Sequence, residues 1–381
     1  MKILIVSHEF PPIGGGGANA CLFLSKEFVK KGHDVTILTA KYGQQPEIEV
    51  TEDSVEIHRV KCLRKKVESS NFVEMFTFLM SAFGKADKLE KQKQYDICLV
   101  FFGIPSGPLA LYLKKKYKLS YVIRSGGGDI PGTQKRFKYV YMLLAPALRK
   151  IWKEAAGIVA NSQGLKERAE TFENRYEISV IENGVDMSFF RPSQKQKKDD
   201  TIKILFVSRL IERKGLQFII PSLKRIQDRV YEACKKKIEL VVVGDGPYRS
   251  VLEELVSENG CKDMVSFVGQ KNKQEVKEYY KDADVFLLPS VWEGMPNVVL
   301  EAMASGLPII MTPCEGSKEI ITDNGIVAEY NSMDEQIVYL CTHHEEREVM
   351  GRNSLRNVEQ KYQWNIIADT YLSFLEERRN S

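Results

Sequence analysis

The sequence has no closely spaced pair of cysteines. Its seven cysteines are scattered over 381 residues, and no two of them form a C-x-x-C motif. Zinc sites and redox motifs use such pairs, and disulfide frameworks are typical of small secreted domains. The sequence therefore predicts reduced thiols, as in a cytosol, rather than a disulfide framework or a zinc site.

Long apolar runs are also missing. The apolar run after Lys2 is too short for a signal peptide. The longest uncharged run, from Ile97 to Leu113, is broken by GIPSGP, and it favours a strand, a turn and a helix. We therefore expect no membrane-spanning segment and a cytoplasmic location.

Signatures of three other protein classes are absent. A G-x-G-x-x-G fingerprint needs glycine three positions after Gly16, where the chain has Asn19, so nicotinamide binding is disfavoured. Basic residues are not interleaved with aromatic residues as in nucleic-acid-binding modules, and no repeat of solenoid length is visible. We therefore expect no nucleic-acid partner.

The residues that are present indicate two globular domains. Hydrophobic residues make up 43% of the chain and charged residues 28%, and 381 residues exceed a usual single domain. A polar segment from Ser193 to Thr201 separates two halves that both alternate strand-like with helical stretches. This alternation predicts an α/β fold with parallel sheets covered on both faces, divided into domains 1–190 and 191–360.

Two glutamates stand out between residues 287 and 310. A strand-like run ends at Pro289, and Pro296 is placed where a helix can begin, because the first helical turn leaves its N–H groups unpaired anyway. Glu293 then lies on the loop and Glu301 on the second helical turn. The helix N-terminus suits a phosphate, whereas carboxylates accept hydrogen bonds from sugar hydroxyls. The pattern therefore indicates a nucleotide sugar.

A glycine-rich loop near the amino terminus is also suited to binding phosphate. Residues 2–7 have the apolar pattern of a buried strand, and a glycine-rich stretch and a helical pattern follow them. Glycines let the backbone approach phosphate oxygens, and the helix start supplies N–H groups. Gly15 and Gly16 are the candidates for this contact.

The glutamate stretch, P-S-x-x-E-G-x-x-x-x-x-L-E-A-M-A-x-G-x-P, resembles the donor-site signature of retaining glycosyltransferases of family four, and the P-P-x-x-G-G loop resembles their amino-terminal loop. The resemblance implies the GT-B fold, with two Rossmann-like domains facing across a deep cleft. It also implies that the acceptor binds the first domain, that the donor binds mostly the second, and that a helix over 361–381 packs back on the first.

The resemblance assigns roles to single residues. It implies that Glu293 contacts the transferred sugar, that Glu301 holds the ribose, and that Arg209 and Lys214 neutralise the diphosphate. The catalytic set is then Glu293, Arg209 and Lys214. The implied donor site consists of Gly15, Gly16, Arg209, Lys214, Gly244, Val268, Gln270, Glu293, Gly294, Met295, Pro296, Asn297 and Glu301.

The sequence departs from the family in the loop around Asp129. Aligning on Asp129 puts Gly126 where the family commonly has a histidine near the reacting centre. Arg124, Ser125 and Asp129 are the polar acceptor-side candidates, and Ser125 and Asp129 are retained. The alternative for Asp129 is a turn-stabilising role.

No metal site is expected. Asp282-Ala283-Asp284 has the Asp-x-Asp form of another glycosyltransferase class, but Asp284 directly precedes a buried strand. Arg209, Lys214 and helix amides would then supply the positive charge. No cofactor is expected beyond the donor, for which we favour a UDP-sugar, with a GDP-sugar as the alternative.

Charge is uneven along the chain. The first 190 residues hold more basic than acidic side chains, which favours either an anionic partner, such as a lipid-linked phosphate or the inner face of a membrane, or dispersed solvated lysines. Arg64, Lys65 and Lys66 precede an apolar stripe at helical spacing, which we interpret as core rather than membrane-facing. The stripe consists of Phe72, Met75, Phe76, Leu79 and Phe83.

The sequence therefore predicts a retaining, metal-independent glycosyltransferase. It would move a hexose from a nucleoside-diphosphate sugar to a glycan or lipid-linked acceptor, as in polysaccharide or lipopolysaccharide biosynthesis. One alternative is a nucleotide-sugar epimerase of the same fold, which needs acid and base residues instead of an acceptor. The other is a noncatalytic binding protein.

Overall fold

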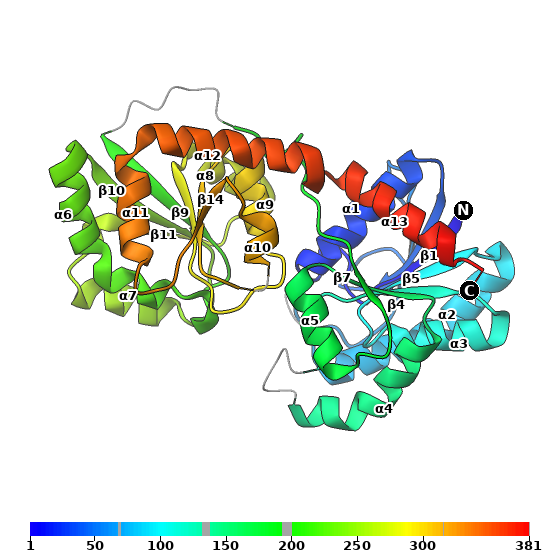
Figure 1. Ribbon diagram of the computed structural model, residues 1–381. Coiled ribbons are helices and arrows are strands. Elements are labelled where there is room, and N and C mark those ends of the chain that lie inside the picture. Colours follow the sequence, from blue (N-terminus) through cyan, green and yellow to red (C-terminus); the bar gives the residue numbers. More distant parts are fainter. Residues whose placement is uncertain (68–69, 132–137, 193–199, 315, 381) are drawn as a thin grey trace. The chain divides into compact units, whose positions relative to one another are not determined.

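The computed structural model describes residues 1–67, 70–131, 138–192, 200–314 and 316–380. The chain divides into two compact units, seen in Figure 1: Met1–Asn183 together with Trp364–Ser381, and Gly184–Gln363. The predicted boundary at residue 190 differs from this division, because Val185 and Phe190 are buried in the core of the second unit. Residues 193–199 of the expected linker lie outside the described residues.

The first unit is built around one sheet of eight strands, in the order β3-β4-β2-β1-β5-β6-β7-β8. Its described strand pairs are parallel except for β3 with β4. Its elements are β1 (Lys2–Val6), α1 (Gly16–Lys30), β2 (Asp34–Ala40), β3 (Ile48–Val50), β4 (Glu56–Val60), α2 (Phe72–Lys93), β5 (Ile97–Phe101), α3 (Gly107–Tyr117), β6 (Tyr121–Arg124), α4 (Lys138–Glu154), β7 (Gly157–Ala160), α5 (Gln163–Phe172), β8 (Ile178–Val180) and α13 (Trp364–Arg378).

Helices cover both faces of this sheet, as Figure 1 shows. Successive strand residues point to opposite faces, so β1 contributes to two apolar cores. Leu4 and Val6 pack with residues of α2, α3, α4 and α5, whereas Ile3 and Ile5 pack with residues of α1 and α13. The last helix of the chain is therefore part of the core of the first unit.

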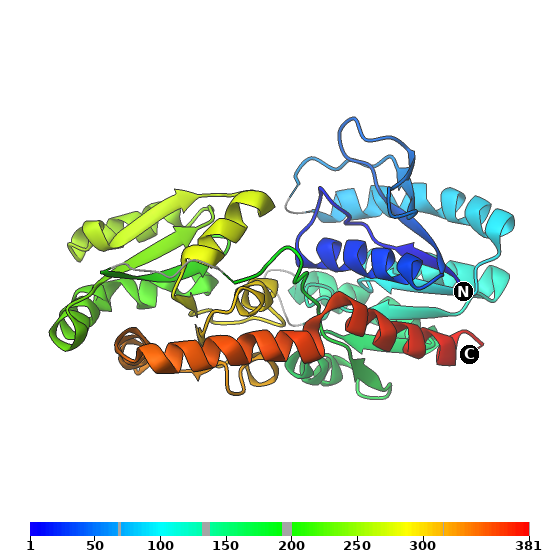
Figure 2. The same ribbon diagram turned by 90° about the horizontal axis from the view of Figure 1, so that it is seen from above.

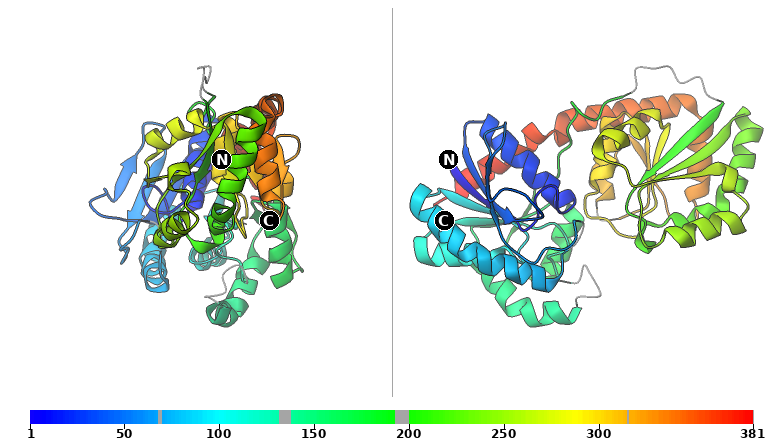
Figure 3. Two further views of the ribbon diagram at one scale, coloured as in Figure 1. Left: turned by 90° about the vertical axis from the view of Figure 1, so that its left-hand side faces the viewer. Right: turned by 180° about the vertical axis from the view of Figure 1, so that it is seen from behind.

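The second unit contains a six-stranded parallel sheet, in the order β11-β10-β9-β12-β13-β14. Helices flank this sheet (Figure 3), and α12 runs along one side of the unit (Figure 2). Its elements are β9 (Thr201–Val207), η2 (Glu212–Lys214), η3 (Leu216–Phe218), η4 (Ile220–Ser222), α6 (Leu223–Cys234), β10 (Lys237–Val243), α7 (Arg249–Glu258), η5 (Lys262–Met264), β11 (Val265–Gly269), α8 (Lys273–Asp282), β12 (Val285–Leu288), α9 (Asn297–Ala304), β13 (Ile309–Met311), α10 (Ser317–Ile320), β14 (Gly325–Val327), α11 (Met333–Thr342), α12 (His344–Asn357) and η6 (Val358–Tyr362).

The strand order of the second sheet marks a place for a ligand. Strand β9 lies between β10 and β12, and the chain builds the sheet outward from β9 in both directions. In parallel sheets of this kind, ligands bind beyond the carboxyl ends of the strands at the point where the order reverses. The loops after β9 and β12 are therefore the first candidates for a site. The predicted α/β class with two Rossmann-like domains is confirmed.

Candidate functional site

The loops that follow β9, β10 and β11 are joined by backbone hydrogen bonds. The Leu210 N–H donates to the Asp245 carbonyl over 3.0 Å, and the Gly244 N–H donates to the Gly269 carbonyl over 2.9 Å. Gly244 has a φ of +134°, and a Cβ there would lie 1.9 Å from the Ser208 carbonyl oxygen. The site predicted at these loop ends thus has a fixed backbone, and Gly244 has a packing reason to be glycine.

The loops after β9 and β12 are also held against each other. The Val291 N–H donates to the Arg213 carbonyl over 2.8 Å. Gly215 adopts a φ of +81°, and a Cβ there would lie 1.7 Å from the Pro289 carbonyl oxygen. This contact brings Lys214, which precedes Gly215, to the loop that carries Glu293.

Lys214 and Glu293 form an ion pair in which both side chains are nearly dry. The Lys214 Nζ contacts Glu293 Oε1, and the two side chains are only 11% and 9% exposed. Burial lowers the pKa of Lys214, while the neighbouring Glu293 carboxylate opposes that shift. The family resemblance assigns Lys214 to the diphosphate and Glu293 to the sugar. In the structure, these two side chains contact each other directly.

Arg213 is a further cation at this place that the sequence analysis did not name. Its Nη1 lies 3.7 Å from Glu293 Oε2 and donates to the Trp292 carbonyl over 2.7 Å. Its guanidinium also lies over the Trp292 ring, 5.5 Å from the centroid. In the sequence, its position directly before Lys214 is the feature that could have indicated it as a site residue. Glu293 thus faces two cations.

Glu301 lies on the second turn of α9, as expected. The Tyr280 hydroxyl donates to Glu301 Oε2 over 3.0 Å. Loss of hydration raises the pKa of Glu301 to about 7, although the Tyr280 hydrogen bond and the charge of Lys273 oppose the shift. Ionisation of the Glu301 carboxylate is therefore unfavourable in the ligand-free protein. A hydroxyl group of a ligand that donates a hydrogen bond to it would stabilise the ionised form.

The other predicted donor residues lie on the same loops. Arg209 follows β9 and is exposed, and its side chain has no hydrogen-bond or ion-pair partner in the described part of the chain. Val268 lies at the end of β11, with the exposed Gln270 directly beyond it. Gly294, the buried Met295, Pro296 and Asn297 lead from Glu293 into α9. All of these positions belong to the carboxyl edge of the second sheet.

The two aspartates of the Asp-x-Asp sequence both contact one lysine. The Lys203 N–H donates to Asp284 Oδ2 over 2.8 Å, and the Lys203 Nζ donates to Asp282 Oδ2 over 2.6 Å. Asp282 is the last residue of α8, and Asp284 directly precedes β12. These carboxylates thus tie the helix end to β9.

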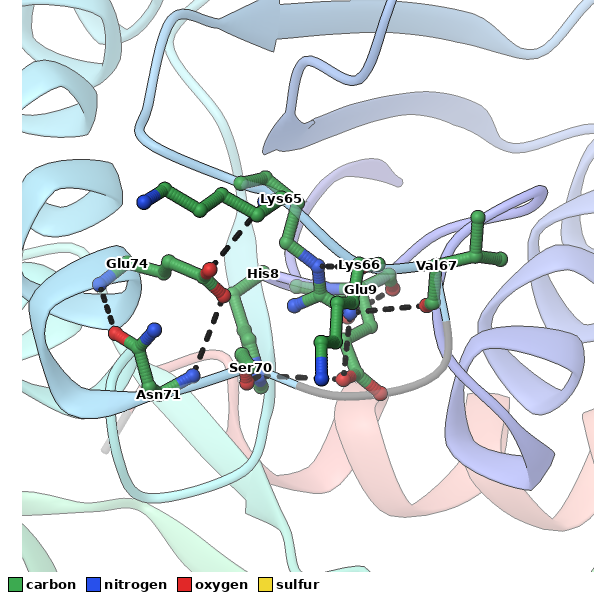
Figure 4. A network of polar contacts seen from close by, with 10 residues as sticks. His8, Glu9, Lys65, Lys66, Val67, Ser70, Asn71 and Glu74 are labelled. Atoms are coloured by element: carbon green, nitrogen blue, oxygen red, sulfur yellow. Dashed lines mark hydrogen bonds and ion pairs between the residues drawn. The ribbon is translucent and has the colours of Figure 1, made fainter. Parts of the chain in front are cut away.

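The predicted glycine loop of the first unit lies close to an acidic side chain. Gly15 precedes α1, which begins at Gly16, and a Cβ on the neighbouring Gly14 would lie 2.7 Å from Glu9 Oε2. Glu9, seen in Figure 4, was not among the residues that the sequence pattern indicated, and it directly follows β1 and the Ser7-His8 pair. The glycine loop for which a phosphate contact was predicted therefore packs against a carboxylate of the same unit.

The acceptor-side candidates Ser125 and Asp129 are both buried. Asp129 Oδ2 accepts a hydrogen bond from the Gly103 N–H over 2.9 Å, and Oδ1 accepts one from the Gly126 N–H over 3.0 Å. The Ser125 N–H donates to the Val159 carbonyl over 2.8 Å. Asp129 thus braces the loops after β5 and β6, which corresponds to the turn-stabilising alternative.

An aromatic ring occupies the space beside Gly126. A Cβ on Gly126 would lie 2.4 Å from a ring carbon of Phe102, and a Cβ on Gly17 would lie 2.5 Å from the same ring. Phe102 follows β5 with a φ of +68°. The histidine that the family commonly has at this position has no room here, because Phe102 fills it.

The apolar stripe predicted for the core of the first unit only partly faces it. On α2, the buried apolar side chains are Phe78, Ala82, Ala86 and Leu89, whereas Phe76 is 61% exposed. The interpretation of Phe76 as a core residue was therefore wrong. Among the described residues, no helix combines the length and apolarity needed to cross a membrane.

Two family models together match most of the chain. The model described as Glycosyltransferase Family 4 matches residues 14–189, and the model described as Glycosyl transferases group 1 matches residues 188–356. Each match covers most of one unit of the structure.

Individual proteins match over similar lengths. An uncharacterized glycosyltransferase of Methanocaldococcus jannaschii is 29% identical, over 97% of this chain and 96% of its own. A GDP-mannose-dependent alpha-(1-6)-phosphatidylinositol monomannoside mannosyltransferase of Mycobacterium tuberculosis is 28% identical, over 74% of this chain and 76% of its own. The sucrose-phosphate synthase structure from Thermosynechococcus elongatus superposes with a TM-score of 0.81 at 19% identity, over 99% of this chain and 98% of that one, which shows a common fold.

Proposed function

Because this chain belongs to the group 1 glycosyl transferases of the GT-B type, we propose that it transfers a sugar from a nucleoside-diphosphate donor to a glycan or lipid-linked acceptor. The observation that carries the proposal is the cluster at the carboxyl ends of β9 and β12. There, Lys214 and Glu293 pair in a nearly dry contact, with Glu301 on the adjoining helix. Cations, sugar-binding carboxylates and a helix start are the groups that a nucleotide sugar needs.

We assign the diphosphate to Arg209 and Lys214. As the bond between the sugar and the diphosphate breaks, negative charge grows on the leaving group, and nearby cations stabilise it more in the transition state than in the ground state. Lys214 is held in place by Glu293, so its ammonium needs no reorganisation during the reaction. Arg209 brings a guanidinium fork that suits phosphate oxygens.

We assign the sugar to Glu293 and the ribose to Glu301, following the family resemblance. The transfer would retain the anomeric configuration, and the departing diphosphate would accept the proton of the acceptor hydroxyl. We also propose that the reaction needs no divalent metal, because Arg209, Lys214 and helix amides supply positive charge. EDTA should then leave turnover unchanged, and a loss restored by manganese would contradict this part.

For the acceptor, we propose a lipid-linked glycan at a membrane surface. The mycobacterial relative is named for a phosphatidylinositol mannoside acceptor, which supports a lipid-linked molecule. The exposed side chains Val73, Phe76 and Met80 on α2 add an apolar stripe to the basic first half of the chain. Peripheral contact through this helix would bring the enzyme to such an acceptor.

Calorimetric titration with free UDP and GDP, followed by turnover with the corresponding sugar donors, tests the donor assignments. Glu301→Gln should weaken the free nucleoside diphosphate and the full donor alike, by about 1–3 kcal/mol for a hydrogen bond to a charged group. Glu293→Gln should lower turnover more than it weakens the free diphosphate, because the free diphosphate carries no hexose and the amide oxygen can still accept a hydrogen bond from Lys214. Equal losses of diphosphate affinity in two folded variants would contradict the assignment of Glu293.

The same turnover measurements separate the proposed transferase from its alternatives. A nucleotide-sugar epimerase would release a new sugar from a UDP-sugar without any acceptor, and a noncatalytic binding protein would bind the donor without turnover. Transfer of the sugar only when a glycan or lipid-linked acceptor is added would support the transferase.

A further inference from the structure

Arg249, the first residue of α7, is held by two carboxylates of the second unit. Its Nε donates to Glu253 Oε1 over 2.7 Å, and its Nη1 donates to Asp245 Oδ2 over 3.2 Å. Its side chain is 32% exposed, so a ligand can still reach it. Two carboxylates and one guanidinium leave this cluster with a net negative charge. Arg249 therefore suits a neutral polar ligand better than a phosphate.

The guanidinium of Arg249 lies at the carboxyl end of β11. Its central carbon is 5.9 Å from the centroid of the Phe267 ring, within the range of a cation–π contact. A Cβ on Gly269 would lie 3.7 Å from Nη1, so the last residue of the strand packs against the guanidinium. Gly269 is fixed in turn, because its carbonyl accepts the Gly244 N–H over 2.9 Å. The ion pairs, the ring and the backbone thus set the position of the guanidinium.

Arg249 keeps hydrogen-bond donors for a ligand. A guanidinium has five N–H groups, and the two carboxylates take one each. The N–H groups that are left have no partner within the part of the chain that the structure describes. They can only donate, so they complement the edge of a ligand that carries hydrogen-bond acceptors.

The guanidinium lies close to the segment that is assigned to the diphosphate. The proposed function places the diphosphate at Arg209 and Lys214. The N–H of Leu210, which directly follows Arg209, donates to the Asp245 carbonyl over 3.0 Å. The carboxylate of the same Asp245 holds Arg249. The loop after β9 is therefore bonded to a residue that positions this guanidinium.

Helix α8 sets the distance from Arg249 to the residue that is assigned to the ribose. The Tyr280 hydroxyl of α8 donates to Glu301, the proposed ribose ligand. The helix begins at Lys273, and a rise of 1.5 Å per residue puts this start about 10 Å from Tyr280. The loop between β11 and α8 is thus about one nucleoside length from the ribose ligand. A base attached to that ribose can reach the end of β11, where Arg249 lies.

Nucleobases differ in the edge that they offer to such donors. Guanine carries the acceptors O6 and N7, and uracil carries O4 as thymine does, whereas adenine and cytosine carry an amino group at the corresponding place. The N–H groups of an arginine pair with a carbonyl oxygen, but an amino group presents a second donor to them. Guanine and adenine are matched in size, and so are uracil and cytosine.

We propose that Arg249 selects the base of the donor, and that this base carries a carbonyl oxygen on the edge facing Arg249, as guanine and uracil do. Asp245 and Glu253 are positioning residues that hold the guanidinium. This inference rests on the proposed function, because it needs a nucleoside diphosphate as ligand. It adds a specificity-determining residue and disfavours ADP-sugars and CDP-sugars as donors.

The experiment compares wild type with Arg249→Met by calorimetric titration at pH 7.5 with GDP, ADP, UDP and CDP. In at least one of the two size-matched pairs, GDP with ADP and UDP with CDP, wild type should bind the keto base about tenfold more tightly. In Arg249→Met this ratio should fall to near one, because methionine keeps an apolar stem against Phe267 but has no N–H donor. The diphosphate is common to all four ligands, so its contribution cancels in each ratio.

Arg352→Met is the matched control. Arg352 is an exposed arginine of α12 that also faces a carboxylate one helical turn away, so its loss should leave every ratio unchanged. A purely structural role for Arg249 would weaken the binding of all four nucleotides by the same factor and also leave the ratios unchanged.

Two further variants refine the test. Arg249→Lys keeps the positive charge but replaces the planar fork with a compact ammonium, so it should also lower the ratio, and it serves if Arg249→Met does not fold. Glu253→Ala removes one of the two carboxylates that hold the guanidinium. Its ratio should lie between those of wild type and Arg249→Met.

Each outcome decides between the two proposals. A preference of wild type for the keto base that is lost in Arg249→Met supports the inference. Binding without such a preference, or a preference that folded Arg249→Met retains, would overturn it while the proposed function stands. Absence of binding of all four nucleotides to wild type would overturn the proposed function, and this inference with it.

Discussion

Two charged side chains at the candidate site differ in what they do for the folded protein. Lys214 pairs with Glu293 in a contact that is nearly closed to water, whereas Arg209 is exposed and has no charged partner in the described part of the chain. Removing one member of a buried pair leaves the other charge uncompensated, while an exposed side chain contributes little to stability. Substitution of Lys214 should therefore lower both stability and activity, whereas substitution of Arg209 should lower activity alone.

We expect Lys214→Met to lower the free energy of unfolding by about 3–5 kcal/mol and also to lower turnover. Arg209→Ala should change the free energy of unfolding by less than about 0.5 kcal/mol, yet raise the activation free energy of transfer by about 2–4 kcal/mol. Urea unfolding and steady-state turnover measure the two quantities. Near-wild-type turnover in folded Arg209→Ala would contradict its assignment to the diphosphate.

Glu301 is a residue at which stability and function should oppose each other. Its pKa is raised to about 7 in the folded protein, so between about pH 4.5 and pH 7 the folded state binds more protons than the unfolded state. Stability must then fall as the pH rises through this window. Glu301→Gln lacks this titration, since the amide carries no ionisable proton.

The ligand-free Glu301→Gln variant should gain stability over wild type as the pH rises, by up to about 3 kcal/mol at pH 8, and the gain should vanish near pH 4.5. Urea unfolding across this pH range measures the difference. A constant difference at all pH values would show that Glu301 does not titrate in this window.

The side chain of Phe102, in the loop after β5, limits which residue types fit in two neighbouring segments of the first unit. Phe102 lies beside both Gly126 and Gly17, and its ring takes the space of their missing side chains. Its backbone has a φ of +68°, a conformation that a bulky residue rarely adopts. The loop after β5 therefore dictates glycine in the loop after β6.

A double-mutant cycle tests this dependence. Gly126→Ala alone should lower the free energy of unfolding by about 1–3 kcal/mol, because its methyl group overlaps the Phe102 ring. Combined with Phe102→Ala, the same substitution should be nearly neutral, since the ring is gone. Strictly additive effects in urea unfolding would show that the two residues do not compete for space.

Helix α2 carries an apolar stripe away from the core. Val73, Phe76 and Met80 are each more than half exposed and share one face of the helix by their spacing. The helix is nevertheless well anchored, because Asn71 and Glu74 form a capping box at its start. An exposed stripe on a stable helix in a basic half of the chain suits a membrane surface with anionic lipids.

Sedimentation with phosphatidylglycerol vesicles tests this surface. The double variant Phe76→Ser, Met80→Ser should bind the vesicles at least about tenfold more weakly, because it loses two apolar side chains that would enter the interface. Tyr231→Ser removes an exposed aromatic side chain of the second unit and is the control. Binding of the double variant as strong as that of wild type would argue against α2 as the contact.

At the scale of the whole molecule, the last residues of the chain complete the first of its two units. Trp364, Ile367, Tyr371 and Leu375 of α13 are buried in the same apolar core as residues of β1 and α1. The second unit has a core of its own, formed within Gly184–Gln363. The stability of the first unit therefore depends on both ends of the chain.

Truncation after Gln363 should unfold the first unit and leave the second folded. Large apolar side chains each contribute about 2–5 kcal/mol when buried, so the loss of four exceeds the stability of a typical domain. Hydrogen exchange read by mass spectrometry should show loss of protection in β1, β5 and α1 and retained protection in β9 and β10. Deletion of residues 379–381 is the control, and protected first-unit strands in the longer truncation would contradict the role of α13.

The sequence by itself indicated the α/β class, the two domains and the residues Arg209, Lys214, Glu293 and Glu301. Those features are local, since strand and helix patterns repeat over a few residues and the glutamates stand in one continuous motif. Sequence motifs, and the family resemblance that they carry, therefore named most of the candidate site.

The tertiary structure alone decided the partners of these residues. Glu9 and Arg64 are 55 residues apart, Lys214 and Glu293 are 79 apart, and Phe102 reaches Gly17 and Gly126 from a third loop. Such contacts depend on how strands are ordered in a sheet, which no local pattern records. For the same reason, only the packed structure could show that Phe76 lies outside the core and that Glu9 packs against Gly14.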